Sequence, residues 1–134
     1  MFSGRLEVSS LKKMEFVDIT AHIEKLIPAS ASNSGVLFLF NPHTTAGLTI
    51  NEGADPDVCL DIISGLSAIV PTNLLFRHAE GNSPSHIMAS LIGSSLTLLV
   101  EDHHLVLGRW QKIFFCEFDG PRTRQIIWRL TSSI

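Results

Sequence analysis

The sequence predicts an α+β domain in which two or three short helices pack on a mostly antiparallel sheet. Three observations support this fold class. Apolar runs typical of strands occupy both ends of the chain. Helical patterns with capping residues lie between them. Short polar separators with Asp, Gly or Pro divide the last strands, as in hairpins. A length of 134 residues suits one core, so we expect a single domain over residues 1–134.

The N-terminal third is expected to contribute strands and one short helix. Two alternating segments indicate half-buried strands that could pair as a hairpin, and a run that is apolar on both faces indicates a central strand sandwiched between layers. The predicted elements are strands Leu6–Ser9 and Met14–Val17, a helix capped by Asp18 or Thr20 that ends at Pro28, a loop to Ser34, and the central strand Gly35–Phe40.

The middle of the chain predicts a strand and two helices. Ala46–Asn51 has strand character, and Asp55-Pro56-Asp57 supplies a capping acid, a proline at the first helical position and a second acid. The helix that follows presents an apolar face from Val58 to Ile69, and Pro71 ends it. A shorter helix over Ile87–Ile92 ends at Gly93.

The C-terminal part predicts four strands joined by hairpin-type turns. The strands are Leu96–Val100, His104–Leu107, Gln111–Phe118 and Thr123–Leu130, and the turns are Glu101-Asp102-His103, Gly108-Arg109 and Asp119-Gly120-Pro121.

Composition excludes several classes of partner. The net charge is −3 without a basic run, so we expect no nucleic-acid partner and no anionic membrane partner. No apolar run is long enough for a membrane span, and no signal peptide is recognisable. Cys59 and Cys116 lie in apolar surroundings and indicate buried free thiols, hence a cytoplasmic protein. An apolar fraction of 45% against 17% charged residues predicts a homo-oligomer.

Two polar segments carry the residues that could do chemistry. Pro42–Asp57 follows the central strand, and His78–His86 precedes a helix. Polar groups at the ends of rigid elements are typical of binding sites, so we expect the two segments to meet.

Three histidines in these segments are candidate metal ligands. His43, His78 and His86 could leave a fourth position of a zinc ion open, with Glu52 or Glu80 fixing a ring tautomer. The alternative is that they are surface or hydrogen-bonded histidines that never meet. The remaining histidines are expected to face solvent: His22, His103 and His104.

Several other residues suit binding of a phosphate. A helix opening at Asn82 and Ser83 presents free N–H groups, and Thr44 and Thr45 add hydroxyls. Arg122 and Arg124 could supply positive charge. The alternatives are simple helix capping for Asn82 and Ser83, and a solvated sheet edge for the two arginines.

Acidic and amide side chains complete the candidates. Glu52 caps nothing obvious and suits a general base. Glu117 lies in an apolar strand, facing outward or buried with a partner such as Arg122. Gln111 could turn its amide into a pocket. No serine or cysteine has a nucleophile context such as GxSxG.

These motifs resemble the YjbQ-type family, also called secondary thiamine-phosphate synthase-like proteins. The resemblance covers nearly the whole chain in order. It rests on His43–Gly47, Ile50–Glu52, Asp55–Asp57, His78–Asn82 with His86, Leu91–Ser95, Leu107–Gln111 and Phe115–Arg122. One residue departs from the family pattern, because Arg109 stands where the family usually has threonine before Trp110.

The resemblance implies a fold, an assembly and an activity. The fold would contain a β-sandwich, the assembly would be a homotrimer, and His43, His78 and His86 would converge on a metal ion, expected to be zinc. The activity would be weak thiamine-phosphate synthase chemistry, in which a thiazole phosphate nitrogen displaces pyrophosphate from a hydroxymethylpyrimidine pyrophosphate.

Together these readings predict a metal-dependent enzyme acting on a small phosphorylated substrate. Thr45, Asn82 and Arg122 would hold phosphate oxygens, with Thr44 and Ser83 as further donors. Thr45, Glu52 and Gln111 are the catalytic candidates. Two alternatives stay open: a non-catalytic trimer that binds a metal or a phosphorylated metabolite, and a metal-dependent phosphohydrolase.

Overall fold

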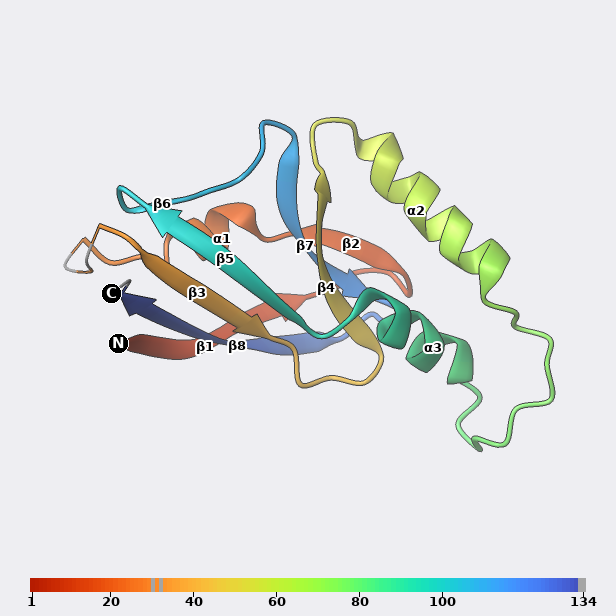
Figure 1. Ribbon diagram of the computed structural model, residues 1–134. Helices are drawn as coiled ribbons and strands as arrows, with labels where there is room; N and C mark the ends of the chain where they lie inside the picture. Colours follow the sequence, from red (N-terminus) through yellow and green to blue (C-terminus); the bar gives the residue numbers. More distant parts are fainter. Residues whose placement is uncertain (30, 32, 133–134) are drawn as a thin grey trace.

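The computed structural model describes residues 1–29, 31 and 33–132. Within this part, two antiparallel sheets face each other, with α1 between them at one end and α2 and α3 beside the smaller sheet (Figure 1). The first sheet has the order β1-β8-β3-β5-β6 and the second β2-β7-β4. The elements are β1 Phe2–Ser9, β2 Glu15–Asp18, α1 Thr20–Glu24, β3 Gly35–Phe40, β4 Ala46–Glu52, α2 Pro56–Ile69, α3 Ser83–Ile92, β5 Ser95–Glu101, β6 His104–Leu105, β7 Gln111–Glu117 and β8 Thr123–Ser132. The predicted α+β class with mostly antiparallel sheet is confirmed.

The main core fills the space between the two sheets. Alternate residues of β3, such as Leu37 and Leu39, point inward and are at most 1% exposed. Leu48 of β4 and Phe115 of β7 meet them from the second sheet. Because strand residues alternate between the two faces of a sheet, this packing also determines which residues face away from the core.

Strand β7 is buried on both of its faces from Ile113 to Glu117. Phe115 faces the first sheet, while Phe114 and Cys116 pack with Leu66 of α2 and Met88 of α3 in a second apolar cluster. Burial raises the pKa of the Cys116 thiol well above its ordinary range. Both cysteines are free, as predicted, but only Cys116 is buried, because Cys59 is half-buried.

The helices differ from the prediction mainly in their bounds. Asp55 caps α2 by accepting a hydrogen bond from the N–H of Asp57 at 2.9 Å, as the sequence predicts. The apolar face predicted for α2 is only partly used, because Ile69 is 68% exposed. Helix α1 ends at Glu24, and α3 begins at Ser83, four residues before the predicted start.

The predicted hairpins are wrong in three of four places. Strand β1 pairs with β8 and β2 pairs with β7, so the first two strands belong to different sheets. The separators at Gly108-Arg109 and at residues 119–121 also lead from one sheet to the other. Only the turn at Asp102 and His103 joins hydrogen-bonded neighbours, β5 and β6, with positive φ at both residues. Alternation marks a half-buried strand but does not specify its partner.

The outer face of the first sheet is open in the single chain. Phe38 and Phe40 of β3 are 46% and 48% exposed, and Leu99 of β5 is 54% exposed. The prediction that β3 is covered on both faces is therefore wrong for one chain. We call Val36, Phe38, Phe40 and Leu99 the open apolar face.

Some expectations concern surface features. His22 and His104 are exposed, as predicted, whereas His103 is half-buried. No helix in the described ranges combines the length and apolar character needed to cross a membrane. The predicted loop before Ser34 includes residues 30 and 32, which lie outside the described residues.

Candidate functional site

The two polar segments predicted to meet do line one cavity. Its volume is about 350 Å³, and we call it the histidine cavity. The loop before β4, the segment leading into α3 and the start of β8 contribute its walls. The lining residues are Pro42, His43, Thr44, Thr45, His78, Glu80, Asn82, His86, Arg122 and Arg124.

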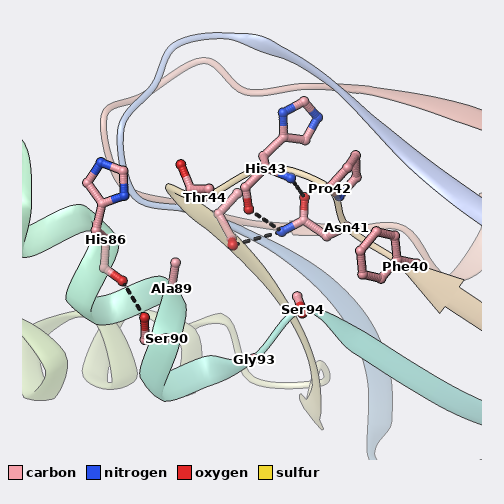
Figure 2. Close-up of a pocket in the computed structure, with 11 residues that line it drawn as sticks. Phe40, Asn41, Pro42, His43, Thr44, His86, Ala89, Ser90, Gly93 and Ser94 are labelled. Atoms are coloured by element: carbon pink, nitrogen blue, oxygen red, sulfur yellow. Dashed lines mark hydrogen bonds between the residues drawn. The ribbon is translucent and has the colours of Figure 1, made fainter.

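Asn41 holds the loop that carries His43. Its buried side-chain oxygen accepts from the His43 N–H at 3.0 Å, and its amide nitrogen donates to the Ala46 carbonyl at 2.7 Å (Figure 2). These two hydrogen bonds fix the backbone between β3 and β4. The sequence analysis did not single out Asn41, although Asn before Pro at a strand end is a recognisable signal for such a turn.

His43 is held by the neighbouring strand β8. Its Nε2 accepts a hydrogen bond from the backbone N–H of Gln125 at 2.9 Å. Burial, and next the charge of Arg124, hold the pKa of His43 below its ordinary value. The ring is therefore neutral at neutral pH.

His78 and His86 form a pair on the other polar segment. Their ring centroids lie 5.3 Å apart and their planes are nearly perpendicular. Helix α3 positions His86, because Ser85 anchors the first turn by donating to the Phe118 carbonyl at 2.7 Å. In the part of the chain that the structure describes, no group of three or more His, Cys, Asp and Glu residues is placed to hold a metal ion.

A buried ion pair of Arg124 and Glu117 lies near His43, and its arginine lines the cavity. Arg124 is 4% exposed and Glu117 is fully buried, and Arg124 Nε donates to Glu117 Oε1 at 2.9 Å. Arg124 Nη2 donates to the other carboxylate oxygen and, at 2.9 Å, to Thr45 Oγ1. Ser10 Oγ donates to Glu117 as well, at 2.8 Å.

This pair corrects two expectations. Arg124 is not at a solvated edge, and the partner of Glu117 is Arg124 rather than Arg122. The signal was present in β8, where Arg124 is in phase with the inward-facing Ile126 and Leu130. Thr45, predicted to be catalytic, is buried and orients Arg124.

Arg122 lies at the mouth of the cavity and is held by Asp119. Its Nε donates to the Asp119 carbonyl at 2.8 Å and its Nη2 to the Asp119 carboxylate at 2.9 Å, while half of the side chain stays exposed. Asn82 donates to the same carboxylate at 3.0 Å and makes no capping hydrogen bond. Asn82 Oδ1 is buried and has no hydrogen-bond partner among the described residues.

Four residues singled out from the sequence are not part of the histidine cavity. Glu52 Oε2 accepts from the Asp55 N–H at 3.2 Å, and Gln111 Oε1 accepts from the Gly108 N–H at 2.7 Å. Both lie at the far end of the β4–β7 pair. Arg109 stacks on Trp110 there, 4.7 Å from the ring centroid. Ser83 opens α3 but does not line the cavity.

A second hollow adjoins the histidine cavity. It measures about 470 Å³, and we call it the neighbouring groove. The two share Pro42, His43, Thr44 and His86 as walls. Figure 2 shows the imidazoles of His43 and His86 on either side of Thr44, with small residues of α3 and its C-terminus lining the groove.

Comparison with known proteins places this geometry in a family. The sequence pattern of the UPF0047, YjbQ-like proteins matches residues 4–133. The chain belongs to the UPF0047 family. A UPF0047 protein of Methanocaldococcus jannaschii is 49% identical over 121 residues, which cover 90% of this chain and 88% of the relative. YugU of Bacillus subtilis is 45% identical and covers 89% of this chain and 91% of its own length.

Solved structures of similar proteins share the fold. A YjbQ/UPF0047 family protein of Clostridium acetobutylicum, described as uncharacterized, superposes with a TM-score of 0.90 at 43% identity, covering 95% of this chain and 98% of that one. A conserved hypothetical protein of Thermus thermophilus gives 0.88 at 44% identity, covering 96% and 99%. These names state no substrate or reaction, so the function must be argued from the cavity itself.

Proposed function

We propose that the histidine cavity binds a divalent metal ion together with a phosphorylated small molecule, and that the protein is an enzyme acting on that molecule. One observation carries the proposal: an imidazole pair, two guanidinium groups and a threonine hydroxyl line the same cavity. Imidazole is a common ligand of zinc and similar ions, and guanidinium and hydroxyl groups are common ligands of phosphate.

The metal half of the proposal rests on His78 and His86. Their adjacent rings suit a two-imidazole site. Asn82, whose buried Oδ1 has no hydrogen-bond partner among the described residues, lines the same cavity. Such a site leaves coordination positions for water or substrate oxygens. A bound divalent ion would supply charge neutralisation and polarisation of a phosphate group.

The phosphate half rests on Arg122 and the loop before β4. Asp119 holds Arg122 by two hydrogen bonds, which preorganises the guanidinium at the cavity mouth. Thr44 is exposed at the wall shared with the neighbouring groove and offers its hydroxyl to either hollow.

The neighbouring groove favours a transfer between two molecules. A phosphorylated donor in the histidine cavity would meet an acceptor in the groove across His43, Thr44 and His86. This arrangement suits a transferase, and the reaction suggested by the family resemblance, displacement of pyrophosphate by a thiazole phosphate nitrogen, is one such transfer.

The turnover test uses hydroxymethylpyrimidine pyrophosphate and thiazole phosphate with zinc-loaded protein. We expect pyrophosphate release and thiamine phosphate formation, lost in His86→Ala and retained in the matched control Glu52→Gln. Tight binding without product would indicate a non-catalytic metabolite-binding protein. Orthophosphate release without product would indicate a phosphohydrolase.

We also propose that the chain assembles as a homotrimer in the cytoplasm. The open apolar face supports assembly, because Phe38, Phe40 and Leu99 are about half exposed on one sheet face, and exposed apolar patches often mark association surfaces. Light scattering would show a trimer for the wild type and smaller species for Phe38→Ser. A monomeric wild type would contradict the assembly.

A further inference from the structure

His43 differs from the other two cavity histidines in how its ring nitrogens are used. Nε2 accepts the backbone N–H of Gln125 at 2.9 Å, so this nitrogen carries no proton. A neutral imidazole with an unprotonated Nε2 carries its proton on Nδ1. His43 thus has one nitrogen engaged as an acceptor and one available as a donor.

This arrangement does not suit a metal ligand. A metal ion needs a free lone pair on one ring nitrogen, and in His43 the Nε2 lone pair is taken by Gln125 while Nδ1 holds the proton. Burial and the nearby Arg124 disfavour the charged ring, which keeps it in this neutral form. His78 and His86 show no such hydrogen bonds among the described residues.

Arg124 adds a second fixed donor to the same wall. Its Nε and Nη2 are used by Glu117 and Thr45, whereas Nη1 has no hydrogen-bond partner in the described part of the chain. Arg124 lines the cavity although only 4% of the residue is exposed. Because the guanidinium is planar and two of its nitrogens are held by hydrogen bonds, its third nitrogen, Nη1, has a fixed orientation.

We propose that His43 is a neutral hydrogen-bond donor to the phosphate of the bound molecule, acting with Arg124, and is not a metal ligand. This inference rests on the proposed function and divides its site into two parts. The metal ion belongs to His78 and His86, and the anion belongs to the wall formed by His43 and Arg124.

The decisive variants are His43→Asn, His43→Ala and His78→Ala. An asparagine amide can replace an Nδ1–H donor, whereas alanine cannot. In calorimetric titrations with zinc alone, we expect both His43 variants to bind like the wild type and His78→Ala to lose about tenfold or more. With inorganic pyrophosphate, we expect a loss of about tenfold in His43→Ala, as for one charge-assisted hydrogen bond, and recovery in His43→Asn.

Nitrogen-15 spectra of the histidine rings give a readout independent of affinity. We expect a protonated Nδ1 and an unprotonated Nε2 in His43, and these signals should keep their tautomer when zinc is added while those of His78 and His86 change. Loss of zinc affinity in both His43 variants, or direct coordination by His43 in the spectra, would overturn this inference but leave the proposed function standing. A wild type that binds neither zinc nor pyrophosphate would overturn both.

Discussion

The two ends of the β4–β7 pair carry polar residues in opposite environments. At one end Ala46 pairs with Glu117, and the carboxylate and its partner Arg124 are buried. At the other end Glu52 pairs with Gln111, and both side chains hydrogen-bond to the backbone of exposed turns. Six residue steps, or about 20 Å, separate these ends.

The contrast shows what a polar segment can and cannot indicate. The residues from Pro42 to Asp57 look like one functional segment in the sequence, but strand β4 runs through the middle of it. Its first half reaches the histidine cavity and its second half caps α2. At the Ala46 end of the β4–β7 pair, buried charges that bond to each other hold the cavity residues in place. At the Glu52 end, exposed polar side chains stabilise turns.

The largest effect should come from breaking the buried pair. Arg124→Met leaves Glu117 buried without its cation, so we expect the free energy of unfolding to fall by about 3–5 kcal/mol. The matched change at the far end, Glu52→Gln, should cost less than about 1 kcal/mol, because Glu52 is partly exposed. Urea denaturation of both variants measures the difference. An equal fall in the free energy of unfolding for Arg124→Met and Glu52→Gln would contradict the difference between the two ends of the β4–β7 pair.

A smaller effect should appear in the pH dependence of stability. Burial alone would raise the pKa of Glu117, but hydrogen bonds from Arg124, Ser10 and the Asp119 N–H outweigh it and hold the pKa below its ordinary value. Because the folded pKa is lower than the unfolded one, the stabilisation is present above the unfolded pKa and is lost as pH falls through the folded pKa.

The free energy of unfolding should therefore decrease as pH is lowered below about 4.5, the ordinary value for glutamate. Urea titrations at a series of pH values would show this decrease in the wild type and a shallower one in Glu117→Gln. An equally steep decrease in the variant would assign the effect to other carboxylates.

The smallest effect should come from Gln111. Its side-chain oxygen accepts from the Gly108 N–H at an exposed turn, so Gln111→Ala should lower the free energy of unfolding by no more than about 0.5 kcal/mol. Pyrophosphate affinity should change by less than about twofold, because the turn lies away from the histidine cavity. A large loss of affinity would show that the far end takes part in binding, as it would if a second chain completed the site.

Much of the fold could be predicted because local signals are strong. The apolar runs located most of the strands, and Asp55-Pro56-Asp57 placed the start of α2 correctly. Strand partners could not be predicted, because the pattern of β1 and β2 shows a buried face but not the sheet that each joins. The exposure of Phe38 and Phe40 could not be predicted either, because a run that is apolar on both faces does not tell whether the chain itself covers the outer face.

The site was predicted in part for similar reasons. The histidines and Arg122 stood out because polar residues at element boundaries are conspicuous. Arg124 was misjudged because its burial depends on Glu117, which comes from another strand. The different role of His43 depends on one backbone N–H of β8, and no pattern of side chains in the sequence encodes that contact.

The most direct test of the account is calorimetric titration of inorganic pyrophosphate into zinc-treated protein. Four proteins are compared: the wild type, His86→Ala, Arg122→Gln and the far-end control Glu52→Gln. We predict equal affinity for the wild type and Glu52→Gln, about tenfold weaker binding for Arg122→Gln, and loss of both zinc and zinc-dependent pyrophosphate binding for His86→Ala. Unchanged binding in His86→Ala and Arg122→Gln would contradict the histidine cavity as the site.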